Sequence, residues 1–133
     1  LALKIVEFAA KNPNPIIIID QLQFINAGRR FESKVSEFDF IMAKLKQTAL
    51  MSDSSVFIAH QLNRDIERRE GKFPQTSDIK DCGRIEEISD LVIMFAKGGK
   101  ESDDNRYCRV IARHWAGSTT VLNWLQKKGA FEV

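Results

Sequence analysis

The chain has 133 residues, of which 44% are hydrophobic and 29% are charged, and its formal net charge is +2. Both fractions are typical of a soluble globular protein, and the length suits one domain of ordinary size. No apolar run approaches the roughly 18 residues that cross a bilayer, and residues 1–10 are too short and too charged for a secretory signal. With so small a net charge, any nucleic-acid binding must come from local loops.

The two cysteines, Cys82 and Cys108, lie far apart and form no C-x-x-C motif. A zinc site is therefore not expected, and we predict free thiols in a cytoplasmic protein. The chain begins at leucine and enters at once into a helical pattern, from which we expect a fragment of a longer protein.

The first half of the chain predicts helices alternating with strands. Residues 3–11 have the apolar spacing of a short helix, which the Asn-Pro-Asn-Pro segment after it ends. Residues 16–20, four isoleucines and an aspartate, predict a buried strand, as do residues 55–60. Between them, residues 33–51 predict an amphipathic helix with Ser33 as its N-cap. Strand, helix and strand in this order predict a βαβ unit with parallel strands.

The second half has a different pattern. Residues 61–83 form a long charged segment, and such loops tend to be functional or disordered. The remaining elements predicted are a short helix at 84–89, strands at 90–96, 106–114, 119–126 and 130–133, and a hairpin turn at 116–118. The sequence therefore predicts an α/β fold with parallel strands and helices, plus a C-terminal antiparallel β-hairpin edge.

Polar residues follow both predicted parallel strands. Asp20 ends the first, where a carboxylate could hold Mg²⁺ through a water or orient an attacking water, or could merely cap the following turn. His60 and Gln61 follow the second strand and should emerge at the same sheet edge. The amide of Gln61 could hydrogen-bond a phosphate or a nucleophilic water, whereas His60 could simply be a satisfied, half-buried histidine.

Two later segments carry weaker signals. In residues 77–83, Lys80 offers an ammonium and Gly83 an unobstructed backbone N–H, which suit a phosphate, although mixed charge is usually solvated surface. Arg113 ends a late predicted strand and could reach a phosphate across a subunit boundary. Trp115 and Trp124 could stack on bases, but such tryptophans more often fill a core or an interface.

Several motifs in order resemble those of DnaB-type replicative helicases. Residues 16–25, Ile-Ile-Ile-Ile-Asp-Gln-Leu-Gln-Phe-Ile, resemble the Walker B strand of that family. Residues 56–64, Val-Phe-Ile-Ala-His-Gln-Leu-Asn-Arg, resemble its third motif with the family's glutamine. Residues 73–86 are similar to its DNA-binding loop, and residues 85–95 to the strand that follows. As a set these motifs are specific, and they cover nearly the whole chain.

The resemblance implies a RecA-like P-loop NTPase that forms a homo-hexamer around single-stranded DNA, binds ATP with Mg²⁺ between subunits, and unwinds duplex. Asp20 then corresponds to the Mg²⁺-linked Walker B aspartate, Gln61 couples the γ-phosphate to the DNA loops, and Arg113 reaches the neighbour's nucleotide. The residues carried over as DNA-binding are Arg64, Lys80, Asp81 and Gly83. Primase and a helicase loader are possible partners, and no membrane is expected.

The departures from the family pattern leave alternatives open. The family's arginine finger falls on Trp115, and Lys80 and Asp81 replace an arginine–glutamate pair, which loses the bidentate fork. The Walker A loop would precede Leu1, so we expect the fragment alone to be unable to hydrolyse ATP. One alternative is a RecA-like recombinase or mediator ATPase, which the loop after Gln61 disfavours. Another is a degenerate, non-catalytic relative that binds only DNA or a partner.

Overall fold

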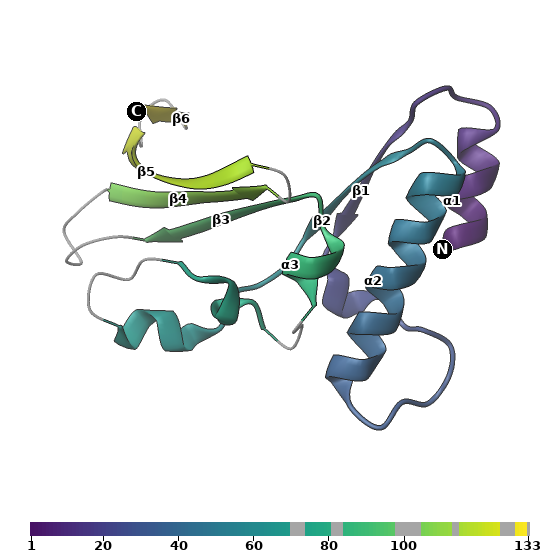
Figure 1. Cartoon of the computed structure of the whole chain (residues 1–133), viewed down its shortest axis with the longest axis horizontal. Coiled ribbons are helices and arrows are strands. Elements are labelled where there is room, and N and C mark those ends of the chain that lie inside the picture. Colours follow the sequence, from purple (N-terminus) through teal and green to yellow (C-terminus); the bar gives the residue numbers. More distant parts are fainter. Residues whose placement is uncertain (70–73, 81–83, 98–104, 113–114, 126–129, 133) are drawn as a thin grey trace. The chain divides into compact units, whose positions relative to one another are not determined.

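The structure is a computed structural model of the chain (Figure 1), described at residues 1–69, 74–80, 84–97, 105–112, 115–125 and 130–132. The chain forms two compact units. The first contains residues 1–61 and 80–88, and the second contains residues 62–79 and 89–133. Among the described residues, no helix is long and apolar enough to span a bilayer.

The first unit contains the predicted βαβ arrangement. Its strands β1 (Ile16–Asp20) and β2 (Ser55–Ala59) pair in parallel, in register from Ile16 opposite Ser55 to Asp20 opposite Ala59. The connection contains the short 3-10 helix η1 (Leu22–Phe24) and the long helix α2 (Lys34–Met51). Helices α1 (Ala2–Ala9) and α3 (Ile85–Ile88) complete the unit. The parallel pairing predicted from the sequence is confirmed.

Helix α2 begins where the sequence predicts. Ser33 has extended backbone angles, and its Oγ accepts a hydrogen bond of 3.1 Å from the Ser36 N–H. This side chain satisfies one of the N–H groups that the first turn of a helix leaves without an intrahelical partner. The predicted N-cap is therefore confirmed.

The core of the first unit lies between the helices and one face of the strands (Figure 1). The side chains that share it are Ile5, Ile19, Leu22, Phe38, Ile41, Met42, Leu45 and Ile85. The other face of the strands is exposed, with Ile16 65%, Ile18 77% and Phe57 57% accessible. The prediction of buried strands is therefore wrong for this face. Alternate side chains of a strand point to opposite faces, and the helices cover only one of them.

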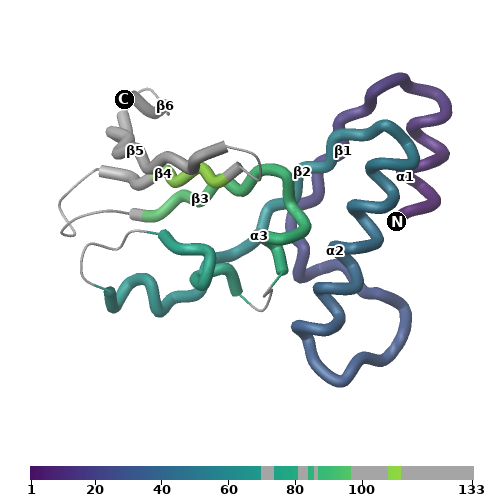
Figure 2. The backbone as a smooth tube through the Cα atoms, viewed as in Figure 1, coloured from purple at the N-terminus to yellow at the C-terminus, as the bar shows by residue number. Residues whose placement is uncertain are grey.

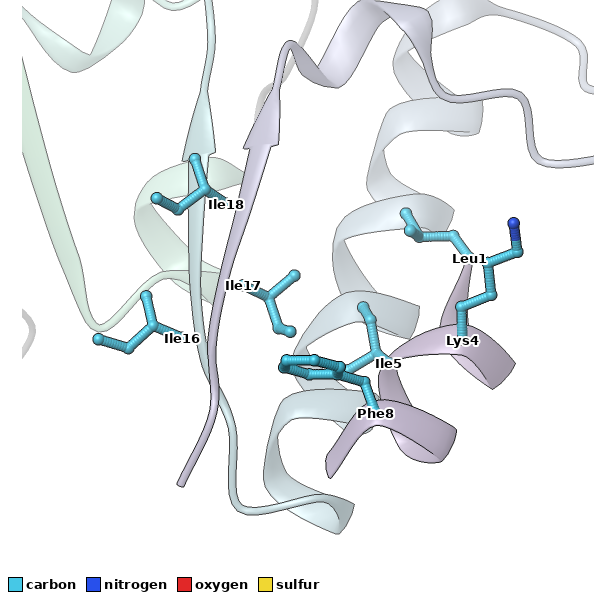
Figure 3. A pocket seen from close by; sticks show the side chains of 7 residues that line it. All are labelled: Leu1, Lys4, Ile5, Phe8, Ile16, Ile17 and Ile18. Carbon is cyan, nitrogen blue, oxygen red and sulfur yellow. The ribbon is translucent and has the colours of Figure 1, made fainter. Parts of the chain in front are cut away.

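An apolar groove of about 340 Å³ lies beside α1 and β1 (Figure 3). It is lined by Leu1, Lys4, Ile5, Phe8, Ile16, Ile17 and Ile18. Ile5 and Phe8 of α1 point toward Ile17 of β1 in this view. Of the predicted site residues that the structure describes, which are Asp20, Gln61, Arg64 and Lys80, none lines this groove.

The second unit is built on an antiparallel sheet. Figure 2 traces in green the backbone of residues 91–96, which belong to its first strand. Strands β3 (Leu91–Lys97), β4 (Asn105–Ala112), β5 (Trp115–Leu125) and β6 (Ala130–Glu132) pair in sequence order. The 3-10 helices η2 (Arg64–Arg68) and η3 (Thr76–Asp78) occupy the segment predicted as a loop. The predicted antiparallel edge is thus present, as a sheet of four strands.

The predicted hairpin turn at 116–118 is wrong, because these residues lie inside β5. The pairing shifts there: Val110 lies opposite Ser118, and Ala112 lies opposite Trp115. β5 therefore has one residue more than β4 between these pairs, which is a bulge. Glycine within a strand commonly marks such a bulge, and Gly117 lies in this one.

Candidate functional site

The carboxyl ends of β1 and β2 meet at one edge of the parallel pair. Asp20, the last residue of β1, lies opposite Ala59, the last residue of β2, so that His60 and Gln61 follow at the same edge. Asp20 and Gln61 are both exposed. In α/β proteins this edge is where ligands bind. The arrangement brings a carboxylate and a neutral amide within one ligand-accessible region.

His60 connects this edge to a residue twenty positions further along the chain. Its Nε2 lies 2.6 Å from the carbonyl oxygen of Lys80, and the Lys80 N–H donates a hydrogen bond of 3.3 Å to the carbonyl oxygen of Gln61. The imidazole is half-buried and meets the Phe38 ring edge-on, with centroids 5.8 Å apart. Both backbone polar groups of Lys80 are therefore bound to the two residues that follow β2, while its side chain is exposed.

The loop that follows Asp20 is anchored on the first turn of α2. The Glu37 carboxylate accepts hydrogen bonds from the Lys34 ammonium at 2.6 Å and from the Ala27 N–H at 3.2 Å. These bonds, that of Lys34 first, lower the pKa of the buried Glu37 carboxyl. Sequence reasoning missed this anchor, although an acidic residue in the first turn of a helix is a signal for it.

The second unit holds its own charged residues in place. Arg69 forms a fork with Asp78, from Nη1 to Oδ2 at 2.9 Å and from Nη2 to Oδ1 at 2.6 Å. The Gln75 N–H adds a bond of 2.7 Å to Asp78, which is 4% exposed. Arg109 Nη1 donates to the Pro74 carbonyl at 3.0 Å. Residues 69 and 74–78 are therefore fixed, where the sequence indicated only mixed surface charge.

Titration of the fork follows from the same contacts. The Arg69 guanidinium lowers the pKa of Asp78, with a smaller contribution from the Gln75 N–H, although burial opposes the shift. Asp78 in turn raises the pKa of Arg69. The carboxylate form of Asp78 is therefore the form that the fold stabilises.

The cysteine on β4 is a free thiol, as the sequence predicts. Cys108 is half-buried, and this burial raises the pKa of its thiol. A raised pKa keeps the sulfur in the unreactive thiol form at neutral pH. Cys82 lies outside the described residues.

The predicted site residues divide between the described and the undescribed parts of the chain. Asp20, Gln61 and Lys80 belong to the first unit and are exposed. Arg64 is exposed at the start of η2 in the second unit. The remaining three, Asp81, Gly83 and Arg113, lie outside the described residues. The structure thus brings Gln61 and Lys80 together through the backbone and places Asp20 at the same edge as Gln61.

The donor set at this edge suits one kind of magnesium site. No group of three or more His, Cys, Asp or Glu side chains within the described ranges could enclose a metal ion. Magnesium commonly binds through one or two carboxylates, keeps several waters, and takes its other ligands from substrate phosphates. The exposed carboxylate of Asp20 fits that arrangement.

Parallel strands that present Asp20 and Gln61 at their carboxyl edge define an α/β protein of the class that binds ligands there. The chain belongs to the family of the DnaB-like helicase C terminal domain, whose model matches residues 1–132.

The chain is also similar to curated proteins named as replicative DNA helicases. The replicative DNA helicase DnaB of Leifsonia xyli is 32% identical over 111 residues, which are 80% of this chain and 24% of that protein. DnaB of Mycobacterium leprae is also 32% identical over 111 residues, which are 80% of this chain and 18% of that protein. The chain therefore spans less than a quarter of the length of these relatives.

Two solved structures share the fold. One is a DnaB-like replicative helicase described with its interactions with primase, at a TM-score of 0.82, 25% identity, and coverage of 98% of this chain and 33% of that one. The other is described as an ATPase domain, at a TM-score of 0.83, 25% identity, and coverage of 98% of this chain and 49% of that one. These matches confirm the predicted fold class.

Proposed function

We propose that the chain is the C-terminal part of a RecA-like motor domain in a hexameric, ATP-dependent replicative helicase. The whole protein would translocate on single-stranded DNA and unwind duplex DNA. One observation carries the proposal. The register that sets Asp20 opposite Ala59 brings Asp20 and Gln61 to one edge, and the Lys80 backbone is bound to that edge. Membership of the DnaB-like family supports it.

The roles at the edge follow from side-chain chemistry. Mg²⁺, when bound with ATP, would neutralise the charge that develops on the phosphates. Asp20 would hold it, directly or through a bound water, because its carboxylate is exposed at the strand end. Gln61 would donate or accept a hydrogen bond at the γ-phosphate or its attacking water without adding charge.

We assign DNA contact to the segment after β2, in which Arg64 and Lys80 are the cations. Lys80 would contact the DNA backbone, together with Asp81, Gly83 and Arg64. Single-stranded DNA is gripped mainly through its phosphates, so exposed cations on an ordered backbone suit this role. Arg113 would reach the nucleotide bound by a neighbouring subunit. Primase and a helicase loader are the partner classes that we propose for the whole protein.

We propose that the phosphate-binding loop comes from sequence outside these 133 residues, because they contain no G-x-x-x-x-G-K-[ST] motif. Without that loop the triphosphate has no cradle of backbone N–H groups, so we propose that the chain alone does not hydrolyse ATP. The relatives' greater length supports the proposal that a longer polypeptide supplies it.

The test is ATP hydrolysis stimulated by single-stranded DNA, measured on the full-length protein that carries this chain. Asp20→Asn should reduce the rate by about 100-fold or more, because it removes a preorganised charge at the metal. The matched control is Asp53→Asn. Asp53 is exposed, follows α2 with a φ of 47°, and asparagine accepts that conformation. Equal rates for Asp20→Asn and wild type would overturn the assignment, and an inactive wild type would favour a non-catalytic relative.

A further inference from the structure

His60 makes a hydrogen bond to Lys80 in addition to its packing contact with Phe38. A carbonyl oxygen can only accept, so the 2.6 Å contact with Lys80 makes Nε2 the protonated nitrogen of the imidazole. The ring is steered by Phe38, which it meets edge-on at 5.8 Å and an interplanar angle of 81°. Helix α2 therefore orients the imidazole, and the imidazole fixes the Lys80 carbonyl.

The Lys80 peptide is bound on both sides of its Cα. Its carbonyl accepts from His60, and its N–H donates to the Gln61 carbonyl at 3.3 Å. Two bonds to adjacent residues of one chain segment restrict both translation and rotation of the Lys80 backbone. The exposed side chains of Gln61 and Lys80 therefore leave from backbone segments that are held against each other.

We propose that His60 is a positioning residue that couples the nucleotide edge to the DNA-binding segment. Any displacement of His60 and Gln61 would move Lys80 with them, because their hydrogen bonds join Lys80 to that segment. This inference rests on the proposed function, since it takes Gln61 to face nucleotide and Lys80 to face DNA. In this role His60 neither binds nucleotide nor touches DNA.

Two substitutions separate the hydrogen bond from the packing. His60→Phe keeps an aromatic ring edge against Phe38 and removes the donor. His60→Gln gives up the ring and retains an N–H that can reach toward the Lys80 carbonyl. If the hydrogen bond matters, the glutamine variant should retain function better than phenylalanine. If only packing matters, the order should be reversed.

The experiment measures binding of fluorescent oligothymidylate to the full-length hexamer, with and without a non-hydrolysable ATP analogue. Hydrogen exchange of the Lys80 amide is followed in parallel. His60→Phe should weaken binding in the presence of nucleotide by about 3- to 10-fold, the usual effect of one hydrogen bond. It should also speed exchange at Lys80, and His60→Gln should restore both partly. In a Lys80→Ala background, His60→Phe should have no further effect on affinity.

The outcomes separate this inference from the proposed function. Wild-type affinity for His60→Phe, with unchanged exchange at Lys80, would overturn the coupling role while leaving the helicase assignment intact. So would an additive loss in the double variant, because His60 would then act independently of Lys80. If Lys80→Ala binds DNA as wild type does, the DNA-binding assignment itself fails and the coupling role fails with it.

Discussion

Arg69 and Asp78 form a two-pronged ion pair across nine residues, with N–O distances of 2.9 and 2.6 Å. The carboxylate is 4% exposed, whereas about a third of the arginine side chain is accessible. Together with the Gln75 N–H, this pair fixes η3 relative to the end of η2. These hydrogen bonds hold Asp78 in place, two residues before Lys80, which we propose to contact DNA.

Loss of the fork should destabilise the second unit. Asp78→Ala removes three hydrogen bonds to a buried carboxylate, two of them from the Arg69 guanidinium. We expect the free energy of unfolding to fall by about 2–3 kcal/mol. Asp65→Ala is the control, because Asp65 is exposed and its contact with Arg68 is 3.9 Å. That change should stay within about 0.5 kcal/mol. Similar urea midpoints for the two variants would contradict the account.

Stability should also depend on pH through Asp78. Its pKa is lowered in the folded state, so the folded protein binds fewer protons than the unfolded chain near the unfolded pKa of about 3.9. The contribution is therefore fully present above that pH and disappears as the pH falls through the folded pKa. Urea unfolding between pH 2 and 6 should show less acid sensitivity for Asp78→Asn. Some sensitivity remains, because the lowered pKa of Glu37 acts in the same direction. Parallel profiles would count against the fork.

The N-cap of α2 can be tested alone. Ser33→Ala should lower the free energy of unfolding by about 1 kcal/mol, because the Ser36 N–H loses its side-chain acceptor. Ser36→Ala retains that N–H and places a better helix former in the first turn, but removes the 2.9 Å hydrogen bond between the two serine hydroxyls, so its loss should be smaller than that of Ser33→Ala. Thermal melting of the two variants gives the comparison, and a Ser33→Ala melting temperature equal to that of wild type would show that the cap contributes nothing.

Gln61 should link hydrolysis to DNA. In the full-length protein, Gln61→Ala should reduce DNA-stimulated ATP hydrolysis by about 10- to 100-fold, because a preorganised donor at the phosphate is lost. Gln47→Ala is the control, since Gln47 is an exposed residue of α2. Stimulation of Gln61→Ala by single-stranded DNA to the wild-type level would rule out the assigned role.

Lys80 should contribute to the electrostatic part of DNA binding. Lys80→Ala should weaken binding to single strands of different sequence by a similar factor and reduce the salt slope by about 1. Lys44→Ala tests specificity, because Lys44 is an exposed lysine on α2, outside the proposed site. A salt titration in which both variants behave alike would exclude a particular role for Lys80.

Local patterns predicted the first unit well, because its signals are short in range. The N-cap at Ser33, the end of α1 before its proline segment, and the strand ending at Asp20 each depend on neighbouring residues. Parallel pairing followed from the order of the elements. The exposed face of β1 was not predictable, because a run of isoleucines looks the same whichever face is covered.

Contacts between residues that lie far apart along the chain could not be predicted from the sequence. Nothing local indicates that His60 bonds to Lys80, or which of several acidic residues pairs with Arg69. The turn predicted at 116–118 failed because a bulge within a strand and a tight turn both favour glycine. The sequence predicted that Asp20 and Gln61 lie at the sheet edge. The two hydrogen bonds that hold the Lys80 backbone could be found only from the structure.

The most direct measurement of the central claim is displacement of the labelled strand of a forked duplex by the full-length protein. We expect displacement that requires ATP and Mg²⁺ and that Asp20→Asn abolishes, while Asp53→Asn unwinds as wild type does. Displacement that proceeds equally with Asp20→Asn, or its absence from a wild-type hexamer that hydrolyses ATP on single-stranded DNA, would contradict the assignment as a replicative helicase motor.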